Sequence, residues 1–83
     1  MQTNKNITLN YFAIFREKAG RPSESVQTLA DSPSDLYCEL AERYGFNLAS
    51  KHIRVAINDQ FSSMDSPLNN GDTIVFIPPV SGG

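Results

Sequence analysis

The sequence of 83 residues contains one cysteine, one histidine and no tryptophan. A single cysteine, Cys38, excludes an internal disulfide and is typical of a reducing compartment, so we expect a cytoplasmic protein. Cys38 and His52 are too few for a zinc site and lack the spacing of a Cys–His nucleophile pair. We interpret Cys38 as a residue on the flank of a helix and His52 as a surface residue. We therefore expect no metal, no bound cofactor and no independent active site.

The sequence also lacks a basic cluster and a long apolar run. Its seven Lys and Arg residues are scattered among nine Asp and Glu residues, for a net charge of −2, which argues against a nucleic-acid partner. No segment approaches the roughly 20 apolar residues of a membrane-spanning helix. Residues 1–10 have no apolar stretch of the kind found in signal peptides. We expect neither a membrane partner nor secretion.

The apolar residues that are present predict one small α+β domain over residues 1–83. Alternation of apolar and polar residues predicts strands at 7–11 and 53–57, with weaker strand signals at 25–29 and 61–64. A short helix is predicted over 13–19, with Gly20 as its stop.

The clearest helix signal begins at Ser32. This residue can cap a helix whose first position is Pro33, and Asp35 is favourable near the positive end of the helix. Apolar residues then recur at helical spacing until Gly45, which is placed to end the helix.

The run from Thr73 to Ile77 is nearly all apolar and β-branched or aromatic. Such a run predicts a strand that is buried on both faces and central in its sheet. A central last strand pairs most easily in parallel with the first strand through the helical crossover. With the helix on one face, this is the layout of a β-grasp, or ubiquitin-like, fold.

After this strand the sequence carries no charged side chain and closes on two glycines. Pro78 and Pro79 favour an extended backbone and cannot donate to a sheet. Val80 offers one apolar side chain and Ser81 is small, while Gly82 and Gly83 can enter a passage too narrow for other residues. We interpret residues 78–83 as an extended arm that presents the carboxylate of Gly83 to an activating enzyme.

The arm resembles the C-terminal signature of the MoaD family, the small subunits of molybdopterin synthase. The resemblance lies in the segment FIPPVSGG at 76–83, the turn LNNGD at 68–72, the segment FAIFRE at 12–17 and the turn at Asn58-Asp59. These motifs follow in order from about residue 7 to residue 83, and the arm is the most specific of them.

The resemblance implies a sulfur carrier. Gly83 would be adenylated by an ATP-dependent enzyme similar to ubiquitin activators, and a sulfur donor protein would convert the adenylate into a thiocarboxylate. The arm would then enter a MoaE-like large subunit, in a complex of two small and two large subunits. There it would supply sulfur to cyclic pyranopterin monophosphate to form molybdopterin.

Three alternatives remain open from the sequence. They are a ThiS-like carrier for thiazole synthesis, a ubiquitin-like modifier joined to target lysines through Gly83, and an interaction domain with an incidental tail. ThiS-like proteins are usually shorter and lack Pro-Pro-Val before the glycines. We further hypothesise that Phe76 and Met64 are exposed beside the arm and help to dock partners.

Overall fold

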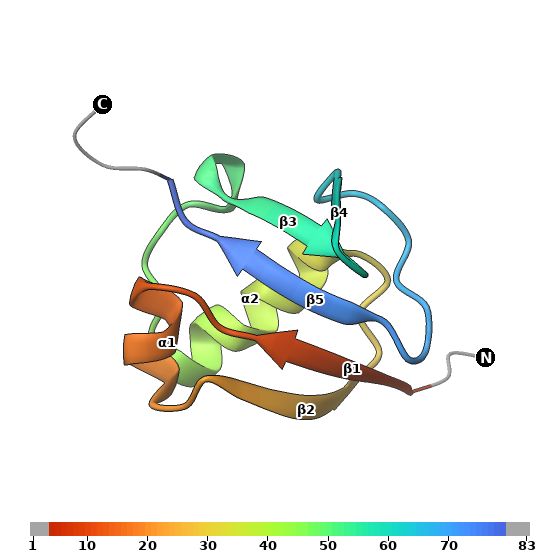
Figure 1. Ribbon diagram of the computed structural model, residues 1–83, viewed down its shortest axis with the longest axis horizontal. Coiled ribbons are helices and arrows are strands. Elements are labelled where there is room, and N and C mark those ends of the chain that lie inside the picture. Colours follow the sequence, from red (N-terminus) through yellow and green to blue (C-terminus); the bar gives the residue numbers. More distant parts are fainter. Residues whose placement is uncertain (1–3, 80–83) are drawn as a thin grey trace.

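The computed structural model describes residues 4–79, which form a five-stranded sheet and two α-helices (Figure 1). The sheet order is β2-β1-β5-β3-β4. The elements, in chain order, are β1 (Lys5–Asn10), α1 (Ile14–Ala19), β2 (Ser23–Thr28), α2 (Pro33–Tyr44), a short 3₁₀ helix (Ser50–His52), β3 (Arg54–Ile57), β4 (Gln60–Ser62) and β5 (Thr73–Ile77).

The last strand lies at the centre of the sheet, as the sequence predicts. β5 pairs in parallel with β1, where Leu9 is opposite Ile74, and antiparallel with β3, where Val55 is opposite Phe76. β1 and β2 form an antiparallel hairpin, and α2 provides the crossover to the second half of the sheet. The β-grasp prediction is therefore confirmed.

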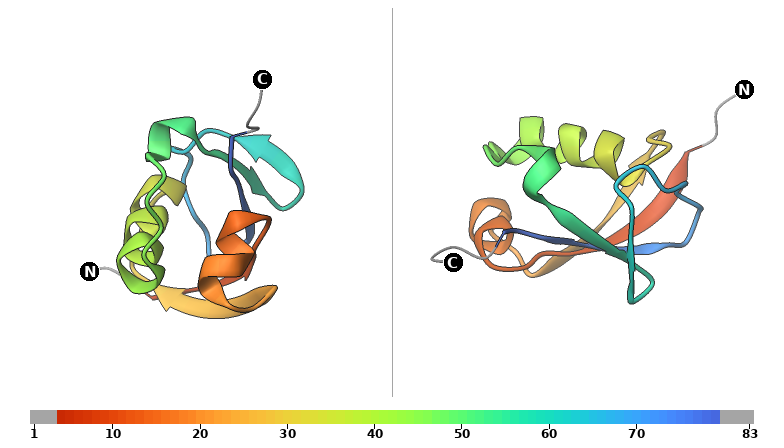
Figure 2. Two further views of the ribbon diagram at one scale, coloured as in Figure 1. Left: turned by 90° about the vertical axis from the view of Figure 1, so that its left-hand side faces the viewer. Right: turned by 90° about the horizontal axis from the view of Figure 1, so that it is seen from above.

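Helix α2 covers one face of the sheet (Figure 2). Its start follows the sequence signal: Ser32 Oγ accepts a hydrogen bond from the Asp35 N–H at 3.2 Å, and Pro33 occupies the first turn. It ends at Gly45, whose φ of +76° is the left-handed conformation that glycine adopts without strain. The core lies between α2 and the sheet, and its fully buried side chains include Ile7, Leu9, Phe15, Leu36, Leu40, Val55, Ile74 and Phe76.

Burial along β5 alternates, which contradicts the prediction of a strand buried on both faces. Ile74 and Phe76 are buried beneath α2, whereas Thr73, Val75 and Ile77 are half-buried on the opposite face. The reason is that this face, called the open face below, has no helix packed against it (Figure 2). A continuous apolar run therefore reflects a central strand whose second face is open.

The beginning of β5 is held by a network of hydrogen bonds. The buried carboxylate of Asp72 accepts from Asn58 Nδ2 at 3.0 Å and from the Asn69 N–H at 2.9 Å. Asn58 also exchanges hydrogen bonds with Thr73: its N–H donates to the Thr73 carbonyl, and its Oδ1 accepts from the Thr73 N–H. The turn after β3 and the turn before β5 are thus joined to each other.

Helix α1 begins one residue later than predicted, because Ala13 is not helical. Its φ and ψ are 54° and −124°, and the Phe15 N–H donates to the Phe12 carbonyl across it at 3.1 Å. This is the first central position of a turn in which positive φ is normally supplied by glycine. The sequence gives no sign of this strain, since alanine is a good helix former.

Within residues 4–79, neither helix is long and apolar enough to cross a membrane.

Candidate functional site

The arm leaves the sheet between two grooves, at the end of the molecule where α1 also lies (Figure 1). Pro78 is half-buried and Pro79 is exposed, and both residues line both grooves. Because a proline has no N–H to donate, the ladder of β5 ends at this point. Pro78 and Pro79 are therefore the root of the predicted arm.

The smaller groove, called the apolar groove, has a volume of about 360 Å³. Beside the two prolines it is lined by Ala13 and Ile14 from the α1 turn, and by Asn47 and Leu48 after α2. The strained conformation of Ala13 thus lies beside the root of the arm. Strained backbone often occurs at functional sites, where the surrounding structure must hold it in place.

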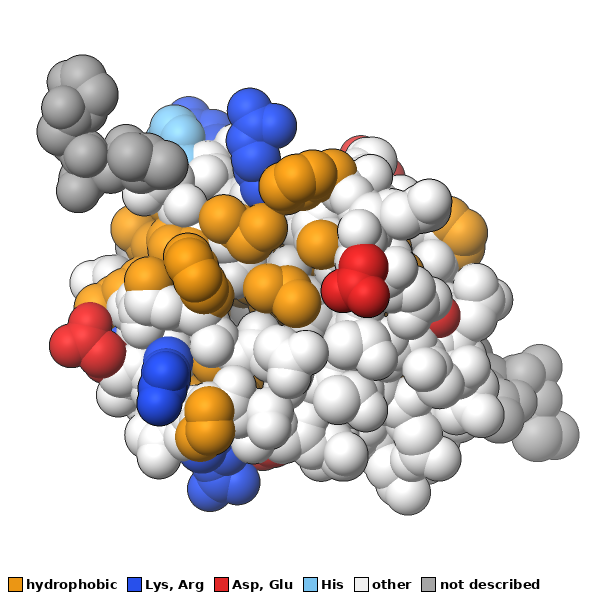
Figure 3. Space-filling model, viewed as in Figure 1, with side chains coloured by type: hydrophobic (Ala, Val, Ile, Leu, Met, Phe, Trp, Pro, Cys, Tyr) orange, Lys and Arg blue, Asp and Glu red, His pale blue; other side chains and the backbone are white. Residues whose placement is uncertain are grey.

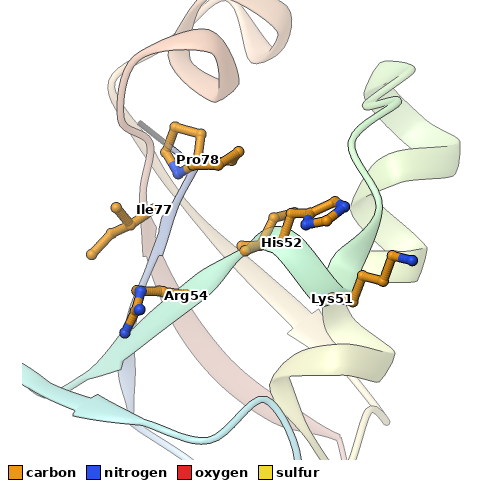
Figure 4. A pocket seen from close by; sticks show the side chains of 7 residues that line it. Lys51, His52, Arg54, Ile77 and Pro78 are labelled. Carbon is orange, nitrogen blue, oxygen red and sulfur yellow. The ribbon is translucent and has the colours of Figure 1, made fainter. Parts of the chain in front are cut away.

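The larger groove, called the basic groove, has a volume of about 510 Å³. Its wall consists of the 3₁₀ helix and the start of β3, which contribute Lys51, His52 and Arg54. All three side chains are exposed. In Figure 4, Arg54 lies with Ile77 on one side of Pro78, whereas Lys51 and His52 lie on the other side.

The open face of the sheet carries an apolar strip that leads to the root. Strand register places Phe61, Ala56 and Val75 side by side across β4, β3 and β5, and Ile77 follows Val75 at the next position on the same face. Phe61 is 73% exposed. Apolar side chains gather on this face over β3 and β5 (Figure 3). Such an exposed strip is typical of a protein–protein contact surface.

Phe12 and Ile14 extend the apolar surface at the same end of the molecule, on either side of the strained Ala13. Their exposed fractions are 57% and 37%. Large apolar side chains on both sides of a strained turn indicate that the turn is maintained for a contact, because the domain gains little from exposing them.

Aromatic side chains form the floor beneath this end of the sheet. Phe46 contacts the rings of Tyr11, Phe15, Tyr37 and Tyr44, with centroid distances between 4.9 and 6.4 Å. Phe76 meets Tyr37 edge-on at 5.5 Å. Aromatic pairs in these geometries each stabilise a core by about 0.5–1.5 kcal/mol beyond their buried area. The end of β5 therefore packs, through Phe76, on this aromatic cluster, called the aromatic base below.

A half-buried carboxylate, that of Glu24, is hydrogen-bonded to this base. Both Tyr11 and Tyr44 donate their hydroxyl hydrogen bonds to Glu24 Oε2, while Arg21 lies 3.6 Å from Glu24 Oε1. Burial alone would raise the pKa of Glu24, but the two tyrosine hydroxyls, assisted by Arg21 and Arg43, hold this pKa below its usual value of 4.5. Burial, and then the hydrogen bond to Glu24, raise the pKa of Tyr11.

The docking hypothesis for Phe76 is wrong. Phe76 is only 2% exposed, because it is one of the two β5 side chains that face α2. Met64 is half-buried against the core, and its carbonyl accepts a hydrogen bond from the Ser34 N–H in the first turn of α2. A docking role for Met64 stays a prediction.

Cys38 is exposed on α2 and His52 is exposed on the 3₁₀ helix, in agreement with the interpretation of Cys38 as a helix-flank residue and of His52 as a surface residue. Across residues 4–79 no cluster of three or more metal-ligating side chains is found. Four predicted arm residues, Val80, Ser81, Gly82 and Gly83, lie outside the described residues.

Sequence reasoning missed both the apolar strip and the basic groove. The strip combines residues from three strands, and only their register shows that Phe61, Ala56 and Val75 are neighbours. One signal was available, because Phe61 is a single large apolar residue between the polar Gln60 and Ser62. Lys51, His52 and Arg54 lie close together in the sequence, but the arm root beside them comes from the other end of the chain.

Comparison with known proteins supports the same reading of the chain. Residues 9–83 match the ThiS family. The chain is 30% identical over 82 residues to the molybdopterin synthase sulfur carrier subunit of Escherichia coli, an alignment that covers 93% of this chain and 99% of that protein. It is 29% identical over 76 residues to the subunit of the same name from Haemophilus influenzae, covering 88% and 94%.

Several solved structures have the same fold, and three of them illustrate the range. The Haloferax volcanii HVO 2177 protein has a TM-score of 0.80 at 27% identity, covering 96% of this chain and 88% of that one. SAMP1 from the same organism has a TM-score of 0.73 at 25% identity, covering 94% and 99%. The third is the complex of subunits 1 and 2 of the molybdopterin-converting factor from Helicobacter pylori, with a TM-score of 0.60 at 26% identity, covering 94% and 99%.

The family match alone does not separate a carrier for thiazole synthesis from one for molybdopterin, whereas the names of both curated relatives favour the second. The chain therefore belongs to the ThiS family, and its resemblance to the MoaD small subunits is confirmed over nearly its whole length.

Proposed function

We propose that this protein is the sulfur carrier subunit of a molybdopterin synthase, and that Gly83 is the residue that carries the sulfur. The observation that carries the proposal is that the family match continues through the arm to residue 83, while the two curated relatives bear this name. The geometry supports it, because the arm root lies between two open grooves and beside an apolar strip suited to protein contacts.

The chemistry follows from the carboxylate, which is a poor electrophile until it is activated. In the proposed first step, a Gly83 oxygen attacks the α-phosphorus of ATP on an activating enzyme, and pyrophosphate leaves. Sulfide sulfur from a donor protein then attacks the carbonyl carbon, the bond to the phosphate oxygen breaks, and AMP leaves. The product is a thiocarboxylate, whose sulfur is the nucleophile for the next transfer.

In the proposed second step, the arm enters a large subunit, and its sulfur forms a bond to a carbon of cyclic pyranopterin monophosphate while a carbon–oxygen bond at that carbon breaks and the oxygen leaves. Water then attacks the Gly83 carbonyl carbon, the bond from that carbon to sulfur breaks, and the carboxylate is restored. Two sulfurs are needed for one dithiolene, which suits two small and two large subunits. The Helicobacter pylori complex of two subunits supports a large-subunit partner for a protein of this fold.

In this proposal the folded domain positions the arm. The aromatic base supports the end of β5, from which the arm leaves. The apolar strip of Phe61, Ala56, Val75 and Ile77 is a contact surface for the partners. We propose that these steps take place in the cytoplasm, where the exposed Cys38 would stay reduced.

The decisive experiment is an intact-mass measurement on protein with an unmodified C-terminus. After incubation with ATP, the activating enzyme and a sulfur donor, one oxygen should be replaced by sulfur, which adds about 16 Da. Deleting Gly83, or adding one residue after it, should abolish this change without altering the unfolding midpoint. A mass that stays constant while a known carrier reacts in the same mixture would refute the proposal.

A second candidate function is protein modification. The likeness to SAMP1, a small archaeal modifier protein, favours it, because that fold is shared and the sequence identity is 25%. In this case the activated Gly83 would form an isopeptide bond with a lysine of a target protein. Isopeptide-linked peptides that end in Gly82-Gly83, detected after proteolysis of cell extracts, would establish this function.

A further inference from the structure

The basic groove brings together three cationic or potentially cationic side chains at the root of the arm. Lys51, His52 and Arg54 line it with Pro78 and Pro79, and no acidic side chain among residues 4–79 lines it. This contrasts with the whole chain, whose net charge is −2. A local basic site on a weakly acidic protein can steer an acidic partner toward this end of the molecule by electrostatic attraction.

Lys51 and Arg54 have no acidic partner among residues 4–79. The ion pairs found there are Lys5 with Asp31 and Arg21 with Glu24, both of which lie outside the groove. The fold therefore does not use the charges of Lys51 and Arg54 for internal pairing.

We infer that the basic groove binds carboxylate side chains of the large subunit that receives the arm. This inference rests on the proposed function. A protein that receives residues 80–83 must cover Pro78 and Pro79, and it then covers the cations on either side of them. Covering a cation without an opposite charge is costly, so the receiving surface must place Asp or Glu side chains there.

The arrangement of the groove favours an acidic protein surface over a small anion. Arg54 lies on one side of Pro78, whereas Lys51 and His52 lie on the other, so the three side chains do not converge on one point (Figure 4). Side chains arranged in this way are poorly suited to binding one phosphate together. An extended surface can place one carboxylate on each side of the arm, which would also fix the direction in which the arm enters.

The test is the kinetics of binding to the molybdopterin synthase large subunit from the same genome. Reversing both charges, with Lys51→Glu and Arg54→Glu, should slow association about tenfold at low salt and flatten its dependence on ionic strength. The matched control is Lys18→Glu, an exposed cation on α1 that lines neither groove. It should leave the association rate within about twofold of the wild type.

The outcomes separate this inference from the proposed function. If the wild-type protein binds and the double variant behaves like the Lys18 variant, the basic groove has no docking role but the carrier proposal stands. If the wild-type protein does not bind the large subunit, both fail. If inorganic phosphate at low millimolar concentration shifts the NMR signals of His52 and Arg54, the groove is a small-anion site. Should the double reversal unfold the domain, Lys51→Gln with Arg54→Gln provides the same comparison at half the charge change.

Discussion

The two ends of β5 differ in how they are held. At the beginning, Asp72 and Thr73 are joined by side-chain hydrogen bonds to the turn after β3. At the other end, among the described residues, no side-chain hydrogen bond reaches Ile77, Pro78 or Pro79, and the two prolines have no N–H to donate. The strand is therefore anchored at its start and released at its end.

This difference indicates how a small domain can fix the direction in which the chain leaves its sheet. The hydrogen bonds at the start of β5 set the register of the strand, and the aromatic base under its end supports Phe76. The root then leaves in a direction that the sheet determines. The two ends can be weakened separately by substitution, and the larger loss of stability is expected at the start of β5.

The largest loss of stability is expected from Asp72→Ala, at the anchored start of β5. The substitution removes the acceptor for Asn58 Nδ2 and the Asn69 N–H, so the free energy of unfolding should fall by about 1–3 kcal/mol. Urea unfolding would measure it. Asp65→Ala is the control, since Asp65 is exposed and should change stability by less than about 0.5 kcal/mol. Equal effects of the two substitutions would show that the anchor does not exist.

An intermediate loss of stability is expected from Glu24→Gln, in the hydrogen-bond network of Tyr11 and Tyr44. The charged acceptor of two tyrosine hydroxyls is replaced by a neutral one, so stability at pH 7 should fall by about 1–2 kcal/mol. Glu17→Gln on the exposed face of α1 serves as the control and should have little effect.

The same variant gives a pH test. Because the folded-state pKa of Glu24 lies below its unfolded value of 4.5, its contribution is complete above pH 4.5 and is lost as the pH falls through the folded value. The stability difference between wild type and Glu24→Gln should therefore shrink on acidification below pH 4.5. A difference that stays constant between pH 7 and pH 3 would contradict the role of the ionised carboxylate.

The smallest change in the free energy of unfolding is expected from Ala13→Gly, and this change should be stabilising. Glycine adopts the positive φ of this position without strain, so the domain should become more stable by up to about 1 kcal/mol. Ala49→Gly is the comparison, because Ala49 has an ordinary extended conformation and glycine there should destabilise slightly. If Ala13→Gly also weakened partner binding, the strained turn would be linked to docking.

Much of the fold was predictable because local signals agree with it. Ser32, Pro33 and Gly45 fix both ends of α2, and the alternation at 53–57 and the apolar run at 73–77 identify β3 and β5. The position of β5 at the centre of the sheet followed from its composition. The arm was recognised for a similar reason, since all its distinguishing residues are contiguous.

The rest depends on contacts between distant residues. The hypothesis that Phe76 is exposed was wrong, because a run of apolar residues does not show which side chains point toward α2. The bonding of Tyr11 and Tyr44 to Glu24 joins three elements, and no spacing in the sequence indicates it. The strain at Ala13 could not be predicted either. The local sequence favours a helix there, whereas the surrounding structure imposes a turn.

The parallel pairing of the first strand with the last also has a consequence for folding kinetics. β1 and β5 are separated by most of the chain, and contacts between such distant segments form slowly because a long loop must be closed first. The apolar groove at the arm root depends on this pairing, since it combines the prolines after β5 with Ala13 and Ile14, which follow β1. A partner that contacts the apolar groove should therefore bind chains in which β1 and β5 have paired, and not chains in which they have not.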